Sequence, residues 1–431
     1  MEKTIGIRRE DKNEWERRVP LIPEHIQELN ERHAIKTQLQ PSSLRIFTAA
    51  DYAAVKAELK DDLSTANTIF AVKEMPVDFF ERGKNYIFFS HVVKGQAYNM
   101  PMLRRMMELK VNLIDYERIV DENGRRLIFF GRYAGLAGMI ETFFAYGQKM
   151  KAAGISTPFK RIKQAYAYSS LADAKTEIAQ LGEYIAENGL PAEVNPVVVG
   201  FAGYGNVSLG AQEIFDLLPF REITPLELIN NFDSLNSEQH LYKVVFKEED
   251  MVKPNSGEFI LQDYYQHPEK YEGVFEQYLP CLTMLVNCIY WTEQYPRLVT
   301  KKYLQSQGKT EQKLKVIGDI SCDIDGSIEL TQKVTYPDQA TFTYHPGSNS
   351  FENGTSAPGI TIMAVDNLPC EFPLESSVEF SMVLKNFVND IVEADFMVPF
   401  EDLQLPFPIK KALILHRGKL TPEYEYIREF L

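Results

Sequence analysis

The chain reads Pro196-Val197-Val198-Val199-Gly200-Phe201-Ala202-Gly203-Tyr204-Gly205-Asn206-Val207-Ser208 near its middle. The first six residues form an apolar run, which is typical of a strand buried on both faces of a parallel sheet. Gly203 and Gly205 then supply the first two glycines of a G-x-G-x-x-G turn, and a helical run follows over 207–218. This order predicts a dinucleotide-binding α/β fold, because backbone amides at such a turn can approach a pyrophosphate.

Five residues of the turn are candidates for cofactor binding: Gly203, Gly205, Asn206, Val207 and Ser208. Ser208 stands where a third small residue is expected, and its hydroxyl could donate a hydrogen bond to a phosphate. A purely structural glycine turn is the alternative interpretation.

The choice of cofactor depends on the end of the next strand, because NAD enzymes usually carry an acid there, ~20 residues after the turn. This chain has Phe220-Arg221-Glu222-Ile223-Thr224-Pro225 in that place, and we expect Thr224 to end the strand. A neutral strand end with Arg221 nearby favours NADP(H). NAD(H) stays possible if Glu222 or Glu227 binds the ribose 2′-hydroxyl instead.

Strands and helices alternate through the first third of the chain. The expected strands lie at 4–8, 34–40, 68–72, 86–90 and 111–114, and the expected helices at 23–32, 49–59, 95–110 and 131–153. Such alternation favours a parallel sheet with right-handed crossovers. Later strands are expected at 283–289, 314–319 and 359–365, a helix at 374–393, and an insertion at 238–278, which is rich in charge and tyrosine.

Two apolar runs of the first third end in residues that can move a proton. Lys73 follows Ile69-Phe70-Ala71-Val72, and His91 follows Tyr86-Ile87-Phe88-Phe89-Ser90. Because ligands bind beyond the carboxyl ends of parallel strands, both side chains are expected at one site. A histidine and a lysine of lowered pKa can exchange protons with a substrate amine near neutral pH. A solvated lysine and a hydrogen-bonded core histidine are the alternatives.

Charge and cysteine content exclude several classes of protein. The 431 residues carry 46 Lys plus Arg against 60 Asp plus Glu, a formal net charge of −14, which makes nucleic acid an unexpected partner. No stretch resembles a signal segment or a membrane span, so we expect a cytoplasmic protein. The four cysteines, at 281, 288, 322 and 370, have no metal-ligand spacing, and no metal is expected.

Four segments resemble one enzyme family. They read Glu16-Arg17-Arg18-Val19-Pro20-Leu21, Val72-Lys73-Glu74-Met75-Pro76, Phe89-Ser90-His91-Val92-Val93-Lys94-Gly95-Gln96 and Phe130-Gly131-Arg132-Tyr133-Ala134-Gly135-Leu136-Ala137-Gly138. They are similar to segments of the lysine:2-oxoglutarate reductase and lysine-forming saccharopine dehydrogenase family, in the wider alanine dehydrogenase and transhydrogenase group. The likeness continues at 203–208, 287–291, 319–321 and 366–369, and so spans nearly the whole chain.

The resemblance implies an α/β fold with two Rossmann-like lobes, parallel sheets and an interlobe active-site cleft. Residues 1–135 would form the substrate and catalytic lobe, completed by about 370–431. Residues 136–369 would form the dinucleotide-binding lobe, with the insertion near 238–278. Lys73 and His91 would be the catalytic acid–base residues. Substrate binding would fall to Arg18, Glu74, Lys94, Glu117 and Arg132, and Asp319 and Asp366 would lie near the cofactor.

The activity that the resemblance implies is the condensation of L-lysine with 2-oxoglutarate and reduction of the imine by NAD(P)H to saccharopine, in a reversible reaction. A separate glutamate-forming saccharopine dehydrogenase is a possible partner, because 431 residues leave no room for such a domain. Two alternatives remain: an alanine-dehydrogenase-like enzyme that aminates a small 2-oxo acid, and an NAD(P)-binding module without catalysis.

Overall fold

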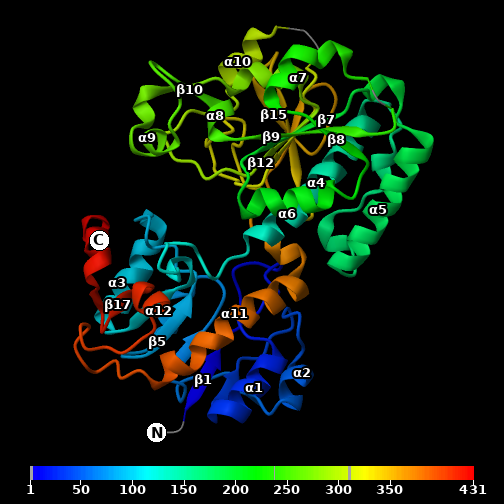
Figure 1. Cartoon of the computed structure of the whole chain (residues 1–431). Helices are drawn as coiled ribbons and strands as arrows, with labels where there is room; N and C mark the ends of the chain where they lie inside the picture. The colour runs from blue at the N-terminus through cyan, green and yellow to red at the C-terminus, as the bar shows by residue number, and fades with distance from the viewer. Residues whose placement is uncertain (1–2, 237, 309–311) are drawn as a thin grey trace. The chain divides into compact units, whose positions relative to one another are not determined.

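The computed structural model describes residues 3–236, 238–308 and 312–431 (Figure 1). The chain divides into two compact units. Unit 1 consists of Met1–Phe130 and Pro373–Leu431, and unit 2 consists of Gly131–Phe372. Each unit contains one eight-stranded, mostly parallel sheet with helices, so the expected α/β fold with two Rossmann-like lobes is confirmed. The interlobe cleft stays a prediction.

The sheet of unit 1 has the strand order β18-β17-β6-β5-β4-β1-β2-β3. Its strands are β1 (Thr4–Ile7), β2 (Lys36–Leu39), β3 (Glu58–Leu59), β4 (Thr68–Phe70), β5 (Asn85–Phe88), β6 (Asn112–Asp115), β17 (Leu413–His416) and β18 (Lys419–Leu420). Its α-helices are α1 (Pro23–His33), α2 (Ala49–Ala54), α3 (Met100–Glu108), α11 (Pro373–Glu393) and α12 (Phe407–Lys411). The pairs from β3 to β6 are parallel, whereas β17 joins β6 antiparallel. The helix expected over 49–59 is shorter than predicted, because β3 begins four residues after α2 ends.

The sheet of unit 2 has the strand order β15-β14-β16-β13-β12-β7-β9-β8. Its strands are β7 (Val198–Ala202), β8 (Phe220–Glu222), β9 (Leu241–Phe246), β12 (Met284–Asn287), β13 (Val316–Asp319), β14 (Thr341–His345), β15 (Ser350–Asn353) and β16 (Ile360–Met363). The strands β10 (Val252–Pro254) and β11 (Tyr271–Gly273) form a separate pair. The α-helices are α4 (Gly131–Ala152), α5 (Leu171–Asn188), α6 (Asn206–Phe215), α7 (Pro225–Asn231), α8 (Glu248–Met251), α9 (Leu261–Gln266) and α10 (Lys301–Ser306). The strand β9 lies inside the segment expected to be an insertion and pairs directly with β7.

Unit 2 buries both faces of its sheet. Val199 and Phe201 of β7 pack with apolar residues of α4, α5 and α6, whereas Val198 and Ala202 pack with those of α7 and α10. Alternate strand residues point to opposite faces, so every residue of β7 is buried, as the apolar run predicts.

The helices α4 and α6 approach each other through glycines. A Cβ built on Gly135 would lie 2.6 Å from the backbone nitrogen of Ala211 and well inside contact distance of the Val207 carbonyl oxygen. A Cβ on Gly210 would meet the Arg132 carbonyl oxygen in the same way. The glycines after residue 130 therefore allow α4 to pack closely against α6, which follows the glycine turn at 203–205.

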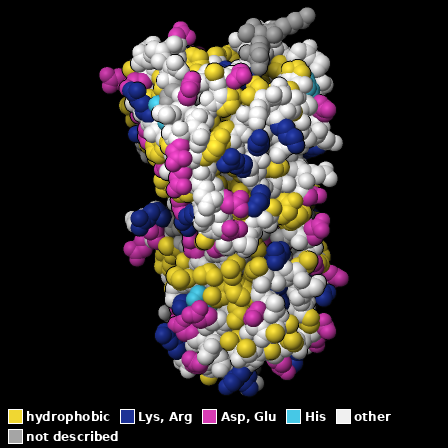
Figure 2. Space-filling view, turned by 90° about the vertical axis from the view of Figure 1, so that its right-hand side faces the viewer, with side chains coloured by type: hydrophobic (Ala, Val, Ile, Leu, Met, Phe, Trp, Pro, Cys, Tyr) yellow, Lys and Arg dark blue, Asp and Glu magenta, His cyan; other side chains and the backbone are white. Residues whose placement is uncertain are grey.

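Charged side chains of both signs are interspersed on the face shown in Figure 2, and no continuous basic area is visible there. Among the described residues, no helix combines the length and apolar character that crossing a bilayer requires. The same residues contain no cluster of three His, Cys, Asp or Glu side chains placed to hold a metal ion.

Candidate active site

Two strand-end loops of unit 1 bring Lys73 and His91 to the same edge of the sheet. Their strands, β4 and β5, are parallel neighbours. The pairing continues past both strands, because the Phe89 amide donates to the Val72 carbonyl oxygen at 3.0 Å. Lys73 and His91 each follow this last pair closely, as the two apolar runs predict.

Glu74 lies against His91. The Nδ1 atom of His91 is 2.6 Å from Oε1 of Glu74, and Nζ of Lys12 is 3.1 Å from Oε2 of the same carboxylate. Burial raises the pKa of Glu74, but the hydrogen bond and charge of His91, together with Lys12, outweigh it and bring the pKa to about 2. Glu74 therefore stays ionised and orients the imidazole through Nδ1, which leaves Nε2 for a substrate.

Lys73 is half-buried, and its surroundings favour the neutral amine. Burial lowers the pKa of its ammonium first, and the nearby Arg18 cation lowers it further. The neutral amine, which can accept a proton from a substrate, is therefore more populated near neutral pH than in a solvated lysine.

Glu10 is a residue of this site that the sequence reasoning missed. Its two carboxylate oxygens accept hydrogen bonds from the backbone amides of Val72 and Lys73, at 2.7 and 3.0 Å. Burial and the nearby Glu16 raise the pKa of Glu10 to about 7, against those two hydrogen bonds. Glu10 thus anchors the peptide that carries Lys73. It lies in the loop after β1, where no local pattern marks it.

Arg18 is buried in an ion pair. Its Nε and Nη2 atoms donate to the two oxygens of Glu16 at 2.8 and 2.6 Å. Its guanidinium carbon lies 4.1 Å from the centre of the Phe130 ring, which stacks on Phe380 at 4.6 Å. This packing fixes the plane of the guanidinium, whose bidentate edge already binds the Glu16 carboxylate. Binding of a substrate carboxylate by Arg18 stays a prediction.

The loop after β6 is held by a fully buried carboxyl group. Asp115 accepts hydrogen bonds from the amide and hydroxyl of Ser90 and from the amide of Glu117. Burial raises the pKa of Asp115, and the Ser90 hydroxyl opposes this rise. The Glu117 carboxylate lies 3.9 Å from Arg126, and Lys94 is exposed. Substrate binding by Glu117 and Lys94 stays a prediction.

The glycine turn of unit 2 joins β7 to α6. Gly203 has a φ of +92°, and its amide donates to the Phe246 carbonyl oxygen at the end of β9. Gly205 caps α6, Asn206 is the first residue of the helix, and a Cβ on Gly205 would meet nothing within 4 Å. The missing side chain therefore leaves open space beside the helix N-terminus, which suits a pyrophosphate.

Two other residues of the turn face the protein interior. Ser208 is fully buried, and its hydroxyl accepts a hydrogen bond from Gln212 at 2.9 Å. Val207 is half-buried and packs among the residues between α4 and α6. Phosphate binding by the Ser208 hydroxyl stays a prediction, and the burial of this side chain argues against it.

Gly205→Ala tests the turn directly. The new Cβ has no clash within the chain, so we expect the melting temperature to stay unchanged. It would occupy the space of a bound pyrophosphate, and we expect nucleotide affinity to fall at least about tenfold. Nucleotide titration by calorimetry measures the loss. Gly347→Ala, which also meets nothing within 4 Å, is the matched control. An unchanged affinity in Gly205→Ala would leave only the structural interpretation of the turn.

Thr224 is not at the end of the strand beside the glycine turn. It caps α7, accepting from the Glu227 amide, and it follows β8 at the edge of the sheet. The strand β7 lies between β12 and β9, and β9 is followed by Lys247 and Glu248. The prediction for Thr224 requires β8, the next strand in sequence, to pair with β7. In the structure β9 pairs with β7, and β8 lies beyond β9.

Glu248 and Lys247 differ in their surroundings. The Tyr265 hydroxyl donates to Glu248 at 2.7 Å, and burial together with Glu248 raises the pKa of Tyr204 in the turn. The Lys247 side chain is exposed. Both residues directly follow β9, and in dinucleotide-binding folds the residue at this strand end binds the ribose.

Three other predicted residues have partners within unit 2. Asp319, at the end of β13, is buried and accepts hydrogen bonds from Asn287 and Thr331 at 2.8 and 2.5 Å. Burial raises the pKa of Asp319 to about 6 against those bonds. Arg132 forms a two-point ion pair with Glu213 of α6. Asp366 is half-buried, and its amide donates to the Thr335 carbonyl oxygen. The functional roles of Asp319, Arg132 and Asp366 stay predictions.

Comparison with known proteins identifies relatives over the whole chain. Residues 6–137 match the family model for the alanine dehydrogenase/PNT N-terminal domain. The chain is 41% identical to the alpha-aminoadipic semialdehyde synthase of Arabidopsis thaliana, over 98% of this chain and 41% of that protein. It is 32% identical to the mitochondrial alpha-aminoadipic semialdehyde synthase of Mus musculus, over 99% of this chain and 47% of that protein. The chain thus spans less than half the length of these relatives.

A fungal relative is matched over most of its length. The chain is 25% identical to a Yarrowia lipolytica protein named as an NAD(+)-dependent, L-lysine-forming saccharopine dehydrogenase, over 80% of this chain and 81% of that protein. Among solved structures, an L-alanine dehydrogenase superposes with a TM-score of 0.62 at 15% identity, over 99% of this chain and 100% of that one. The transhydrogenase of Sinorhizobium meliloti gives 0.54 at 14% identity, over 97% and 100%. These two structures share the fold. Residues 6–137 thus match the alanine dehydrogenase/PNT N-terminal domain, and the chain is similar over nearly all of its length to alpha-aminoadipic semialdehyde synthases.

Proposed function

We propose that this chain condenses L-lysine with 2-oxoglutarate and reduces the resulting imine with a nicotinamide nucleotide to saccharopine, in a reversible reaction. The observation that carries the proposal is the group formed by Lys73, Glu74 and His91 at one edge of the unit 1 sheet. The open glycine turn of unit 2 and the names of the relatives support it.

The residues of unit 1 fit the proton transfers of this reaction. The lysine ε-amine adds to the oxo carbon, and the carbinolamine then loses water to give the imine. His91, oriented by Glu74 through Nδ1, would donate a proton through Nε2 to the departing hydroxyl and take it back in the reverse direction. Lys73 would exchange the proton of the secondary amine, for which its lowered pKa suits it. When bound, the nicotinamide nucleotide supplies the hydride for the imine carbon.

Absorbance at 340 nm tests the activity with lysine, 2-oxoglutarate and reduced nucleotide. We expect nucleotide oxidation that requires both lysine and 2-oxoglutarate. Oxidation with ammonia and pyruvate alone would instead favour an alanine-dehydrogenase-like enzyme. Nucleotide binding without any turnover would favour a binding module.

For the cofactor we propose NADP(H), with Lys247 binding the 2′-phosphate. The support is the exposed ammonium directly after β9, while Glu248 already accepts the Tyr265 hydroxyl. We expect Lys247→Ala to weaken NADPH binding at least about tenfold and to leave NADH binding unchanged. Nucleotide calorimetry with both cofactors measures this.

Two matched variants decide the alternatives. If Glu248→Ala weakens NADH binding while Lys247→Ala changes neither affinity, the ribose is read by Glu248 and NAD(H) is the cofactor. If only Arg221→Ala weakens NADPH binding, the phosphate lies against the edge strand β8.

The cytoplasmic location and a separate glutamate-forming partner enzyme stay predictions. The mouse relative is named mitochondrial.

A further inference from the structure

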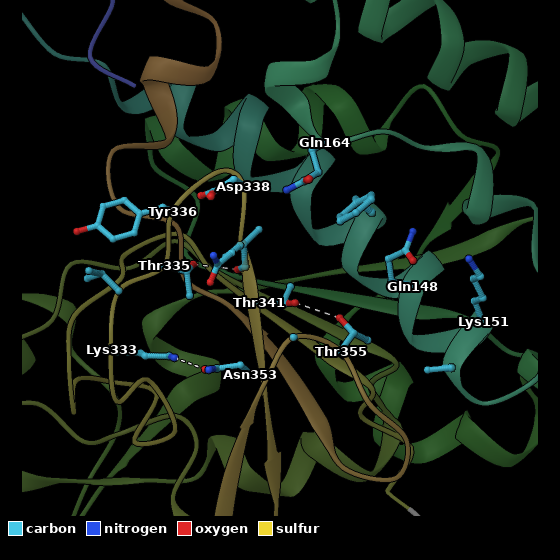
Figure 3. A pocket seen from close by; sticks show the side chains of 16 residues that line it. Gln148, Lys151, Gln164, Lys333, Thr335, Tyr336, Asp338, Thr341, Asn353 and Thr355 are labelled. Carbon is cyan, nitrogen blue, oxygen red and sulfur yellow. Dashed lines mark hydrogen bonds between the residues drawn. The ribbon is translucent and has the colours of Figure 1, made fainter. Parts of the chain in front are cut away.

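Unit 2 contains a cavity of about 920 Å³ between the C-terminal half of α4 and the β14–β15 hairpin (Figure 3). This volume lies within the range of small-molecule sites, roughly 300–1,000 Å³. Gln148 and Lys151 project from α4 on one side, and Lys333 and Asn353 lie on the opposite side. The side chains of Thr335, before β14, Thr341, in β14, and Thr355, after β15, lie between them.

The cavity is separate from the nucleotide turn. Gln148 lies thirteen residues beyond Gly135, which packs under the turn, so the two are about 20 Å apart along α4. Across the sheet, β14 is four strand spacings from β7, again about 20 Å. The lining includes none of the residues of the turn, nor Asp319.

The lining carries an excess of positive charge, although the chain as a whole has a net charge of −14. The charged residues of the lining are Lys151, Lys333 and Asp338. Lys333 donates to the neutral amide oxygen of Asn353, which leaves its charge uncompensated. Within residues 3–236, 238–308 and 312–431, neither the Lys151 ammonium nor the Gln148 amide has a partner. A ligand with anionic groups is therefore the expected complement.

One wall of the cavity is rigidly held. The Gln164 amide donates to the Pro337 carbonyl oxygen and lies 3.5 Å from the Glu141 carboxyl group. The Ala165 amide donates to Glu141 at 2.6 Å, and the Tyr166 amide donates to Glu371 at 3.1 Å. These hydrogen bonds fix the loop that carries Gln164 against α4, so the polar lining is organised before a ligand binds.

We propose that this cavity binds an α-amino dicarboxylic acid, such as L-glutamate, at a site separate from catalysis. Lys151 and Lys333, on opposite sides, bind the two carboxylates, and Asp338 binds the ammonium group. The lining has two positive charges and one negative charge, whereas the ligand has two negative charges and one positive charge, so each charge of the ligand has a partner of opposite sign. The Gln148 amide supplies a further hydrogen bond. The inference does not depend on the proposed reaction.

Calorimetric titration of the full chain with L-glutamate tests the site. We expect saturable binding that weakens at least about tenfold in Lys151→Ala and in Lys333→Ala. Lys302→Ala, which removes an exposed lysine of α10 in the same unit, is the matched control and should change nothing. Asp338→Asn should weaken glutamate binding and leave the binding of glutarate, which has no ammonium group, unchanged. Hydrogen exchange should show glutamate-dependent protection at 335–341 and 353–355.

Three outcomes would overturn the proposal. The first is the absence of saturable glutamate binding at millimolar concentration. The second is glutamate binding that is lost in Arg18→Ala but kept in both cavity lysine variants, which would assign the ligand to unit 1. The third is equal affinity for glutamate and L-glutamine, which would exclude a role for the second carboxylate. Turnover at 340 nm is a separate readout, and Lys151→Ala and Lys333→Ala should retain it.

Discussion

Lys73→Met should lower the turnover of lysine and 2-oxoglutarate between about 100-fold and 10,000-fold, which is the usual contribution of a general acid–base group. Methionine keeps the length of the side chain and tolerates burial, so the fold should survive. The backbone amide of residue 73 would still donate to Glu10. Steady-state kinetics at 340 nm measure the loss, and nucleotide affinity should stay unchanged because the glycine turn belongs to unit 2.

The pH dependence adds a second readout. Burial and Arg18 lower the pKa of Lys73 from the ordinary 10.5, so the neutral amine becomes populated at lower pH than in a solvated lysine. In the direction that oxidises saccharopine, a base must accept a proton, so the rate should rise with pH and level off below pH 10.5. Lys73→Met should abolish that limb of the profile. Lys419→Met, an exposed lysine of unit 1, is the control. Wild-type turnover and an unchanged pH profile in Lys73→Met would show that Lys73 is not the acid–base group of the reaction.

Strand ends can be predicted from the sequence where the strands are plain apolar runs. The apolar runs before Lys73 and His91 overlap β4 and β5, and the parallel pairing of these strands places both residues at one edge of the sheet. The run at 196–201 predicted β7, and the glycines after it predicted the turn. These predictions succeed because a strand buried on both faces has a continuous apolar signal and because parallel neighbours end at the same edge.

The order of strands within unit 2 could not be predicted from local pattern. The sequence of β9 is interrupted by Lys243, whose buried ammonium is neutralised by Asp216 at 2.8 Å. A charge in the middle of a strand hides its apolar signal, so the local pattern indicates an insertion there. The same pattern places the ribose at Thr224, although the strand that pairs with β7 on this side ends at Phe246.

Glu10 shows a second limit of local pattern. It reaches from the loop after β1 to two amides 62 and 63 residues later in the chain. Nothing near Glu10 in sequence reports that contact, because it depends on the pairing of β1 with β4. The cavity beside β14 is hidden for the same reason, since Lys151 and Lys333 are brought together only by the fold.

Gly135→Ala should lower the free energy of unfolding by about 3 kcal/mol, the upper part of the usual range for overpacking. Alanine favours a helix over glycine by about 1 kcal/mol, so a site with room would be stabilised instead. At Gly135 the added Cβ meets backbone atoms of α6, which cannot rotate away as a side chain can. Steric repulsion therefore exceeds the gain in helix propensity, and α4 must separate from α6.

Denaturant unfolding of the full chain measures the loss in Gly135→Ala, with Gly347→Ala as the control that should stay within about 0.5 kcal/mol. Gly210→Ala adds a Cβ to the facing helix and should cost a similar amount. Because either change separates the same two helices, the double variant should lose less than the sum of the single variants. Full additivity would mean that the two glycines act at independent contacts. Unchanged stability in Gly135→Ala would mean that α6 shifts without cost, and the nucleotide turn at its N-terminus would then be a mobile element rather than a fixed one.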